Sequence, residues 1–96
     1  MPMVYRIEAT ITASDVLAAE AGLRRRVEEV LTGILQTAEE IRRLGDVDLS
    51  GIASLPMQVR VANHLVWYAL DLDRLSAKVL VVDRMGERAE GKSRVV

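Results

Sequence analysis

The stretch GERAEGKS, residues 86–93, has the residue types and the spacing of a phosphate-binding P-loop. A P-loop holds phosphate because a strand delivers a glycine-rich turn to the N-terminus of a helix, whose free N–H groups and dipole attract the anion. Only three residues follow Ser93 in this sequence, so no helix can begin there. We therefore predict that residues 85–96 form a charged C-terminal tail, and that the protein binds no nucleotide and needs no cofactor.

Few other residues have the types that catalysis or metal binding requires. His64 is the only histidine, and cysteine is absent. His64 could recruit only Asp71, which makes a poor metal site because zinc uses about four ligands. No serine lies in the strained turn that exposes a nucleophile. The sequence therefore predicts no metal ligand and no enzymatic activity, and we expect His64 to be a hydrogen-bonded residue at the surface or at an interface.

The stretch EEVLTGILQTAEEIRRLGD, residues 28–46, resembles the carboxylate pattern of the all-helical MazG-type nucleotide pyrophosphatases, in which acidic residues hold magnesium. Thr32 and Arg43 stand where that pattern has acids. Glu28 and Glu39 share a helix face but would lie about 16 Å apart along its axis. One Mg²⁺ with oxygen ligands at about 2.1 Å does not bridge that distance. We therefore favour a solvated helix surface over a magnesium site.

The elements that must position any functional residues are indicated by the hydrophobic period. Residues 3–13 alternate between apolar and polar, which predicts a half-buried strand. Ser14 and Asp15 offer an N-cap, and the apolar residues that follow predict one amphipathic helix over residues 15–44. Gly45 supplies its C-terminal stop. Residues 45–54 are rich in turn formers and predict a linker.

Residues 55–84 fit two structures. Seven apolar residues repeat in steps of four and three, the spacing of a coiled-coil seam, and predict a second long helix. They are Val61, Leu65, Tyr68, Leu72, Leu75, Val79 and Val82. The same residues can instead form three strands, MQVRVA, LVWYALDL and KVLVVD, which turn at Asn63–His64 and near residues 74–76.

We favour the helix, so the predicted fold class is α+β and mainly α. A single domain over residues 1–84 would contain an N-terminal strand and a hairpin of two long helices. The alternative is a β-α-β-β-β chain with a small antiparallel sheet, which would give the N-terminal strand a partner. A strand before two helices is also similar to the ribbon-helix-helix DNA-binding proteins, but Glu8 on the outward face of that strand would oppose phosphate.

Both structures leave more apolar surface on residues 55–84 than one helix can cover, which predicts a homo-oligomer. In the helical version two hairpins would form a four-helix bundle, with the N-terminal strands pairing across the dimer. The predicted oligomer interface is the apolar seam of the second helix. Its residues are Leu65, Tyr68, Leu72, Leu75 and Val79.

The polar face of the same helix would place cationic and amide side chains around a tryptophan. The predicted partner-binding residues are Arg60, Asn63, Trp67, Arg74 and Lys78. Tryptophan among cations can anchor a protein interface or stack on an unpaired base. We therefore predict a non-enzymatic, homo-oligomeric binding module, with a protein that binds single-stranded DNA or RNA as the alternative.

The composition limits the partners and the location. The 96 residues are 50% hydrophobic, which is enough for one core, and the net charge of -1 provides no global attraction for nucleic acid or anionic lipid. No apolar run is long enough to cross a bilayer, so we expect a cytoplasmic protein that contacts no membrane. Absent cysteine and few amide side chains also suggest a thermophilic source.

Overall fold

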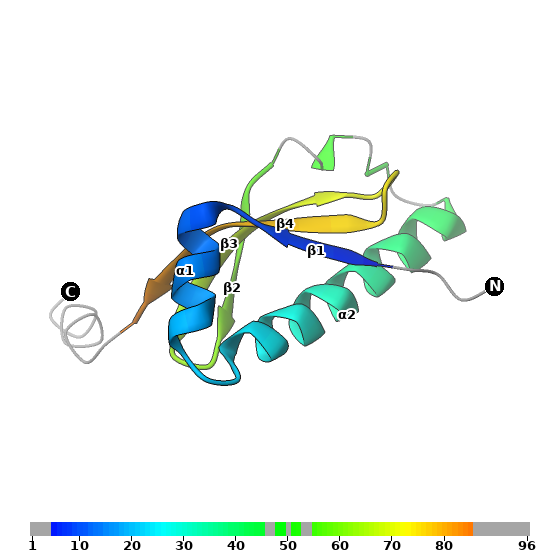
Figure 1. The fold of residues 1–96 in the computed structure, drawn as a ribbon. Coiled ribbons are helices and arrows are strands. Elements are labelled where there is room, and N and C mark those ends of the chain that lie inside the picture. The colour runs from blue at the N-terminus through cyan, green and yellow to red at the C-terminus, as the bar shows by residue number, and fades with distance from the viewer. Residues whose placement is uncertain (1–4, 46–47, 50, 53–54, 86–96) are drawn as a thin grey trace, which may run out of the picture.

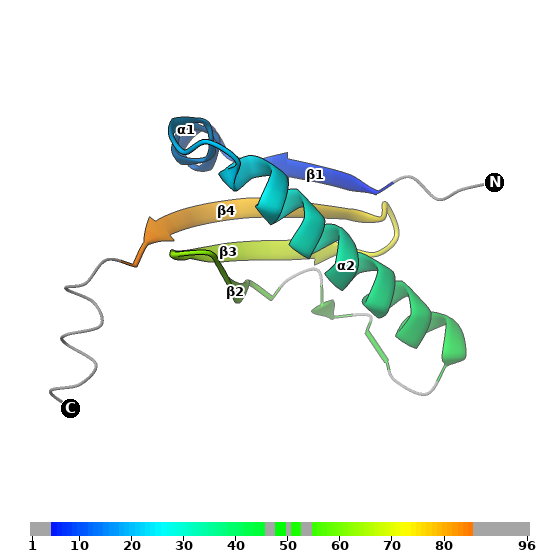
Figure 2. The same ribbon diagram turned by 90° about the horizontal axis from the view of Figure 1, so that it is seen from below.

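One long α-helix crosses one face of a four-stranded sheet, and a second, shorter α-helix packs beside the edge of the sheet at the end of the first strand (Figures 1 and 2). The computed structural model of the chain describes residues 5–45, 48–49, 51–52 and 55–85. The elements, in chain order, are β1 (Arg6–Ala9), α1 (Ile11–Ala19), α2 (Leu23–Leu44), β2 (Met57–Val61), β3 (His64–Asp71) and β4 (Ser76–Arg84). The strands lie in the order β1-β4-β3-β2, with β1 parallel to β4 and the other neighbours antiparallel.

The predicted mainly α fold with a helical hairpin is wrong, because residues 55–84 form the meander of β2, β3 and β4. The alternative β-α-β-β-β order agrees with the sheet. Four of the seven seam positions are buried in strands and Leu72 is buried in the turn after β3, so burial could not separate the two structures. The strand period shows instead in β3, where His64, Val66, Tyr68 and Leu70 are buried and the residues between them are half-buried. The N-terminal strand pairs with β4 of its own chain rather than across a dimer.

The first strand and the first helix also differ from the prediction. β1 ends at Ala9, and Thr10 rather than Ser14 caps α1, because the Thr10 hydroxyl accepts the N–H of Ala13 at 3.2 Å. Ile11, which alternation placed on the buried side of a strand, is 84% exposed in α1. The predicted single helix is interrupted by a turn at Gly22, whose φ of 79° suits glycine. Gly45 ends α2 as predicted, with a φ of 79° and its N–H bonded to the Arg42 carbonyl.

One core lies between the helices and the sheet. α2 crosses the sheet obliquely (Figure 2), and its buried residues recur every three or four positions, as one face of a helix requires. They are Leu23, Val27, Leu31, Leu35 and Ala38. They belong to the same cluster as Val66, Tyr68 and Leu70 of β3 and Val79 and Val82 of β4. α1 adds Ala13 and Leu17 to this cluster.

A β-bulge in β4 decides which of its residues join that core. Val81 is the partner of Trp67 and Val79 is the partner of Tyr68, so Leu80 is an extra residue on β4. The extra residue shifts the alternation by one position. Ala77, Val79 and Val82 therefore point to the helices, and Asp83 points away from them. Thr10 holds the bulge, because its N–H donates to Val79 O and its hydroxyl donates to Leu80 O, both at 3.0 Å.

Replacement of Thr10 tests this link between the helix cap and the bulge. Thr10→Ala removes one hydrogen bond to the first turn of α1 and one to the bulge, and should lower the free energy of unfolding by about 2 kcal/mol. Thr10→Ser keeps the hydroxyl and should lose less than half of that. Urea unfolding of the three proteins measures the difference, and equal losses in both variants would contradict the assignment.

Burial of Tyr68 makes the stability depend on alkaline pH. Desolvation raises the pKa of Tyr68 above its usual value of 10.0, because burial disfavours the phenolate. The stabilising contribution is therefore complete below about pH 10, where the unfolded chain still holds the proton, and is lost as pH rises through the pKa of the folded protein. Urea unfolding between pH 8 and about pH 11 should show a smaller alkaline loss of stability in Tyr68→Phe. Identical slopes would disprove the effect.

Candidate functional site

The sheet has two faces of different character. The face that α2 crosses is apolar, and we call the other one the open face because no described helix lies across it (Figures 1 and 2). Register and burial place alternate residues of each strand there. They are Arg6 and Glu8 of β1, Gln58 and Arg60 of β2, Leu65, Trp67, Ala69 and Asp71 of β3, and Ser76, Lys78, Val81 and Asp83 of β4.

The centre of the open face is apolar. Trp67 is half-buried and lies between Gln58 and Val81 on the neighbouring strands. Leu65 and Ala69 precede and follow Trp67 on the same side of β3. Val81 is 45% exposed, although it is a large hydrophobic residue in the middle of a strand pair. An apolar centre with a tryptophan at its middle is typical of a surface that binds another macromolecule.

The charges around this centre balance. Arg6, Arg60 and Lys78 are cationic, and their number is matched by Glu8, Asp71 and Asp83. Lys78 and Asp83 lie at opposite ends of the apolar centre, because Lys78 pairs with Ala69 and Asp83 pairs with Leu65. Both side chains are exposed, and neither forms an ion pair with another described residue. On β4, the apolar centre thus lies between Lys78 at one end and Asp83 at the other, and Glu8 of β1 lies beside Lys78.

The predicted partner-binding residues are brought together only in part. Arg60, Trp67 and Lys78 share the open face, as strand residues rather than as a helix surface. Asn63 lies in the exposed turn between β2 and β3. Arg74 lies in the turn between β3 and β4, where its Nε is 3.8 Å from Asp71 Oδ2. Three of the five residues thus form one surface.

The residues of the predicted oligomer interface do not share a surface. Tyr68, Leu72 and Val79 are buried in the core of the single chain, at 5%, 5% and 0% exposure. Leu75 lies in the turn before β4 with a φ of 52°, in the left-handed region. Leu65 alone lies on the open face. The apolar surface that these residues were expected to share is divided between the core, a turn and the open face.

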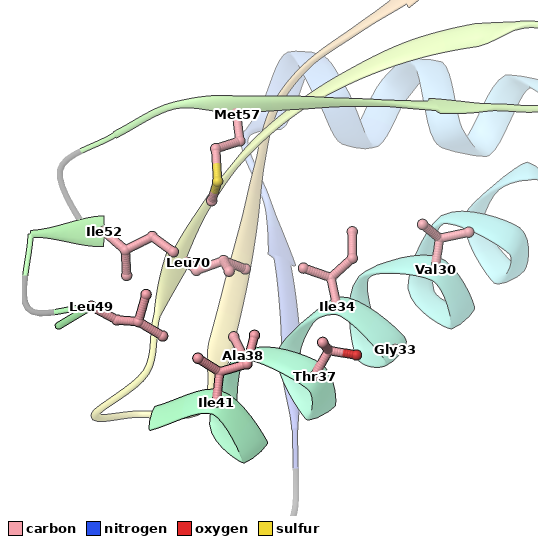
Figure 3. Close-up of a pocket in the computed structure, with 10 residues that line it drawn as sticks. All are labelled: Val30, Gly33, Ile34, Thr37, Ala38, Ile41, Leu49, Ile52, Met57 and Leu70. Atoms are coloured by element: carbon pink, nitrogen blue, oxygen red, sulfur yellow. The ribbon is translucent and has the colours of Figure 1, made fainter. Parts of the chain in front are cut away.

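A second surface, missed by the sequence analysis, is an apolar groove of about 560 Å³ beside α2. Side chains of α2 face those of Leu49, Ile52 and Met57 across it (Figure 3). The α2 residues are Val30, Gly33, Ile34, Thr37, Ala38 and Ile41, and Leu70 of β3 lies at the back. Thr37 is the only lining residue with a polar side chain, so the groove can bind by burial of apolar groups and offers little hydrogen bonding. The signal for it in the sequence is the apolar Val30, Ile34 and Ile41, which widen the apolar side of this helix beyond its buried residues.

A small polar hollow lies at the end of the sheet where β1 and β4 begin. Arg6, Glu8, Arg74 and Ser76 line it, and its volume is about 410 Å³. The two guanidinium groups are accompanied by Glu8 within the hollow and by Asp71 beside Arg74. The opposing charges leave no excess of positive charge for an anion.

His64 is buried at the other end of the sheet, not at the surface as expected. It is 4% exposed, and its Nε2 lies 4.0 Å from Glu20 Oε1. Arg84 Nη1 approaches the same oxygen at 3.9 Å. The buried Nδ1 of His64 has no hydrogen-bond partner in the described structure. These three side chains join the end of α1 to the ends of β3 and β4.

The described residues show no feature of a metal site or of a membrane-spanning helix. No group of three or more His, Asp or Glu side chains there could hold a metal ion. The GERAEGKS stretch lies outside the described residues. No described helix has the length and apolar character needed to cross a bilayer. Comparisons of the chain with protein-family models, curated proteins and solved structures found no match.

Gly33 tests whether the groove is an open space in the folded protein. A Cβ added to Gly33 would meet no atom within 4 Å, and the residue lies inside α2. Gly33→Ala should therefore raise the free energy of unfolding by about 1 kcal/mol, the difference in helix propensity. Gly45→Ala is the matched control and should lower it, because a φ of 79° is strained for alanine. Loss of stability in Gly33→Ala would show that the space is filled.

Proposed function

We propose that this chain is a non-enzymatic interaction module that works as a homo-oligomer and associates through the open face of its sheet. The observation that carries the proposal is the apolar centre of that face, where Trp67 lies among Leu65, Ala69 and Val81. A sheet usually buries an apolar face against another layer. The helices supply that layer on one side only, so a partner supplies it on the other.

The charge of the open face favours a protein partner over nucleic acid. A protein that binds DNA or RNA neutralises phosphates with an excess of lysine and arginine. Arg60, Trp67 and Lys78 do lie on one surface, which is the feature that supports the single-stranded nucleic acid alternative. Three acidic side chains offset the three cations of this face, however, and the whole chain has a net charge of -1. Equal numbers of positive and negative side chains suit a protein surface that also carries charges of both signs, because opposite charges can then meet across the interface.

The proposed setting is the cytoplasm, as expected from the sequence. A thermophilic source is proposed on composition alone, because the chain has no cysteine, one asparagine and two glutamines. Neither proposal bears on the surface that binds.

Sedimentation velocity tests the proposed function directly. The unsubstituted protein should sediment as an oligomer at micromolar concentration. Trp67→Lys should raise the dissociation constant by at least about thirtyfold, the effect of losing a hot-spot tryptophan. Circular dichroism and urea unfolding should show that the fold is kept. Ile11→Lys, on the exposed side of α1, is the matched control and should leave the oligomer intact.

Two results would contradict the proposal. One is a monomer at high micromolar concentration in the unsubstituted protein. The other is quenching of Trp67 fluorescence by oligo-dT or oligo-U that fades as salt rises, because phosphate contacts depend steeply on ionic strength. The second result would support the nucleic acid alternative.

A further inference from the structure

We propose that the open face binds the same face of a second copy of this chain, about a two-fold axis that crosses the strands at Trp67. In this arrangement Lys78 of each copy meets Asp83 of the other. The proposal rests on the proposed self-association and adds its geometry and its specific contacts. It follows from the positions of four residues around Trp67 and from the rules of sheet packing.

The symmetry of a face-to-face pair limits the choices. A two-fold axis between two stacked sheets must lie in the plane between them, because each copy presents the same surface. An axis at a given angle to the strands makes the strands of the two copies cross at twice that angle. Aligned sheets cross at about 30° or less. For aligned packing, the axis therefore runs nearly along the strands or nearly across them.

An axis across the strands at Trp67 gives matching contacts. It exchanges the two ends of the open face and keeps β4 opposite β4. The row that contains Lys78 and Ala69 then lies against the row that contains Asp83 and Leu65. Two oppositely charged pairs form, and each leucine meets the small side chain of an alanine. The two Trp67 side chains meet at the centre, where a hot-spot residue is best shielded from water.

An axis along β3 gives poorer contacts. It places every open-face residue of β3 against itself, so Asp71 would oppose Asp71, which is unfavourable. Leu65 would oppose Leu65, with no small residue to receive it. One favourable contact would form, an ion pair between Arg60 of one copy and Asp83 of the other, because these two residues are the register partners of Leu65 on β2 and β4. Lys78 would have no acid opposite it, because β2 begins at Met57 and does not extend to that row.

The area of the open face fits a weak dimer. Its strands have 4, 5, 8 and 9 residues. At about 3.3 Å per residue and about 4.8 Å between strands, they project roughly 400 Å² per copy. Two copies would bury roughly 800 Å² of projected area, which is the size of weak, transient protein pairs. We therefore expect a dissociation constant in the micromolar range or above.

Charge reversal provides the test. Lys78→Asp and Asp83→Lys each place like charges at both ends of the interface, and each should raise the dissociation constant of the dimer by about tenfold or more. Mixing the two variants should restore association, because the heterodimer pairs Asp at position 78 with Lys at position 83 and leaves the native Lys78 and Asp83 paired. Sedimentation velocity of each variant and of the mixture at low salt measures these effects.

The restoration cannot arise within one chain. Positions 78 and 83 are about 13 Å apart along β4, because their register partners are four residues apart on β3, and this is beyond the reach of a direct ion pair. Both side chains are exposed, so the substitutions should leave the fold intact, as circular dichroism can verify. The doubly substituted chain, with Lys78→Asp and Asp83→Lys together, should also dimerise like the unsubstituted protein.

The outcomes separate this geometry from the proposed function. Recovery in the mixture and in the double variant supports the axis across the strands. A protein that dimerises but shows no recovery overturns this geometry and leaves self-association standing. Recovery between Arg60→Asp and Asp83→Lys instead would identify the axis along β3 and likewise overturn the proposal. A monomeric unsubstituted protein would overturn both.

Discussion

The two faces of this sheet depend on the contact between the Thr10 hydroxyl and the Leu80 carbonyl. Thr10 is the last residue before α1, and the same hydroxyl that holds the bulge also accepts the first N–H bond of that helix. The Thr10 side chain thus bonds at the point where β1 ends and α1 begins, and at the point where the alternation of side chains along β4 shifts by one residue. Without this shift, Asp83 would point into the apolar core, where an unpaired carboxylate is costly.

The helices and the sheet therefore sort the side chains by chemistry. The core residues of α2 pack against the apolar residues on the helix side of β2, β3 and β4 and exclude water. Lys78 and Asp83 of β4 lie on the open face instead. α2 also has an apolar flank beyond its core stripe, where Ile34 and Ile41 line the groove with Leu49 and Ile52. Among the described residues we find two apolar surfaces, and of these two the open face combines apolar groups with charges of both signs that can fix the orientation of a partner.

The sequence specified some elements and left others open, for physical reasons. α2 and its stop at Gly45 were predictable, because a long amphipathic period and a left-handed glycine are local signals. The meander was not, because Val61, Tyr68 and Val79 are apolar at positions that suit a coiled-coil seam and a buried strand equally. The bulge left no mark in the sequence, since Leu80 between two valines is ordinary in either structure. Arg60, Trp67 and Lys78 do lie on one surface, but that surface is a sheet and not the predicted helix.

The position of β1 has a consequence for how the chain acquires its structure. β1 pairs only with β4, the last strand, across a separation of 70 residues, whereas β2, β3 and β4 are joined by short turns. Closing so long a loop costs chain entropy that the local hairpins do not pay. During synthesis β1 is made before the other described elements, but its partner β4 is the last of them to be made. β1 is therefore among the last of these elements to enter the sheet.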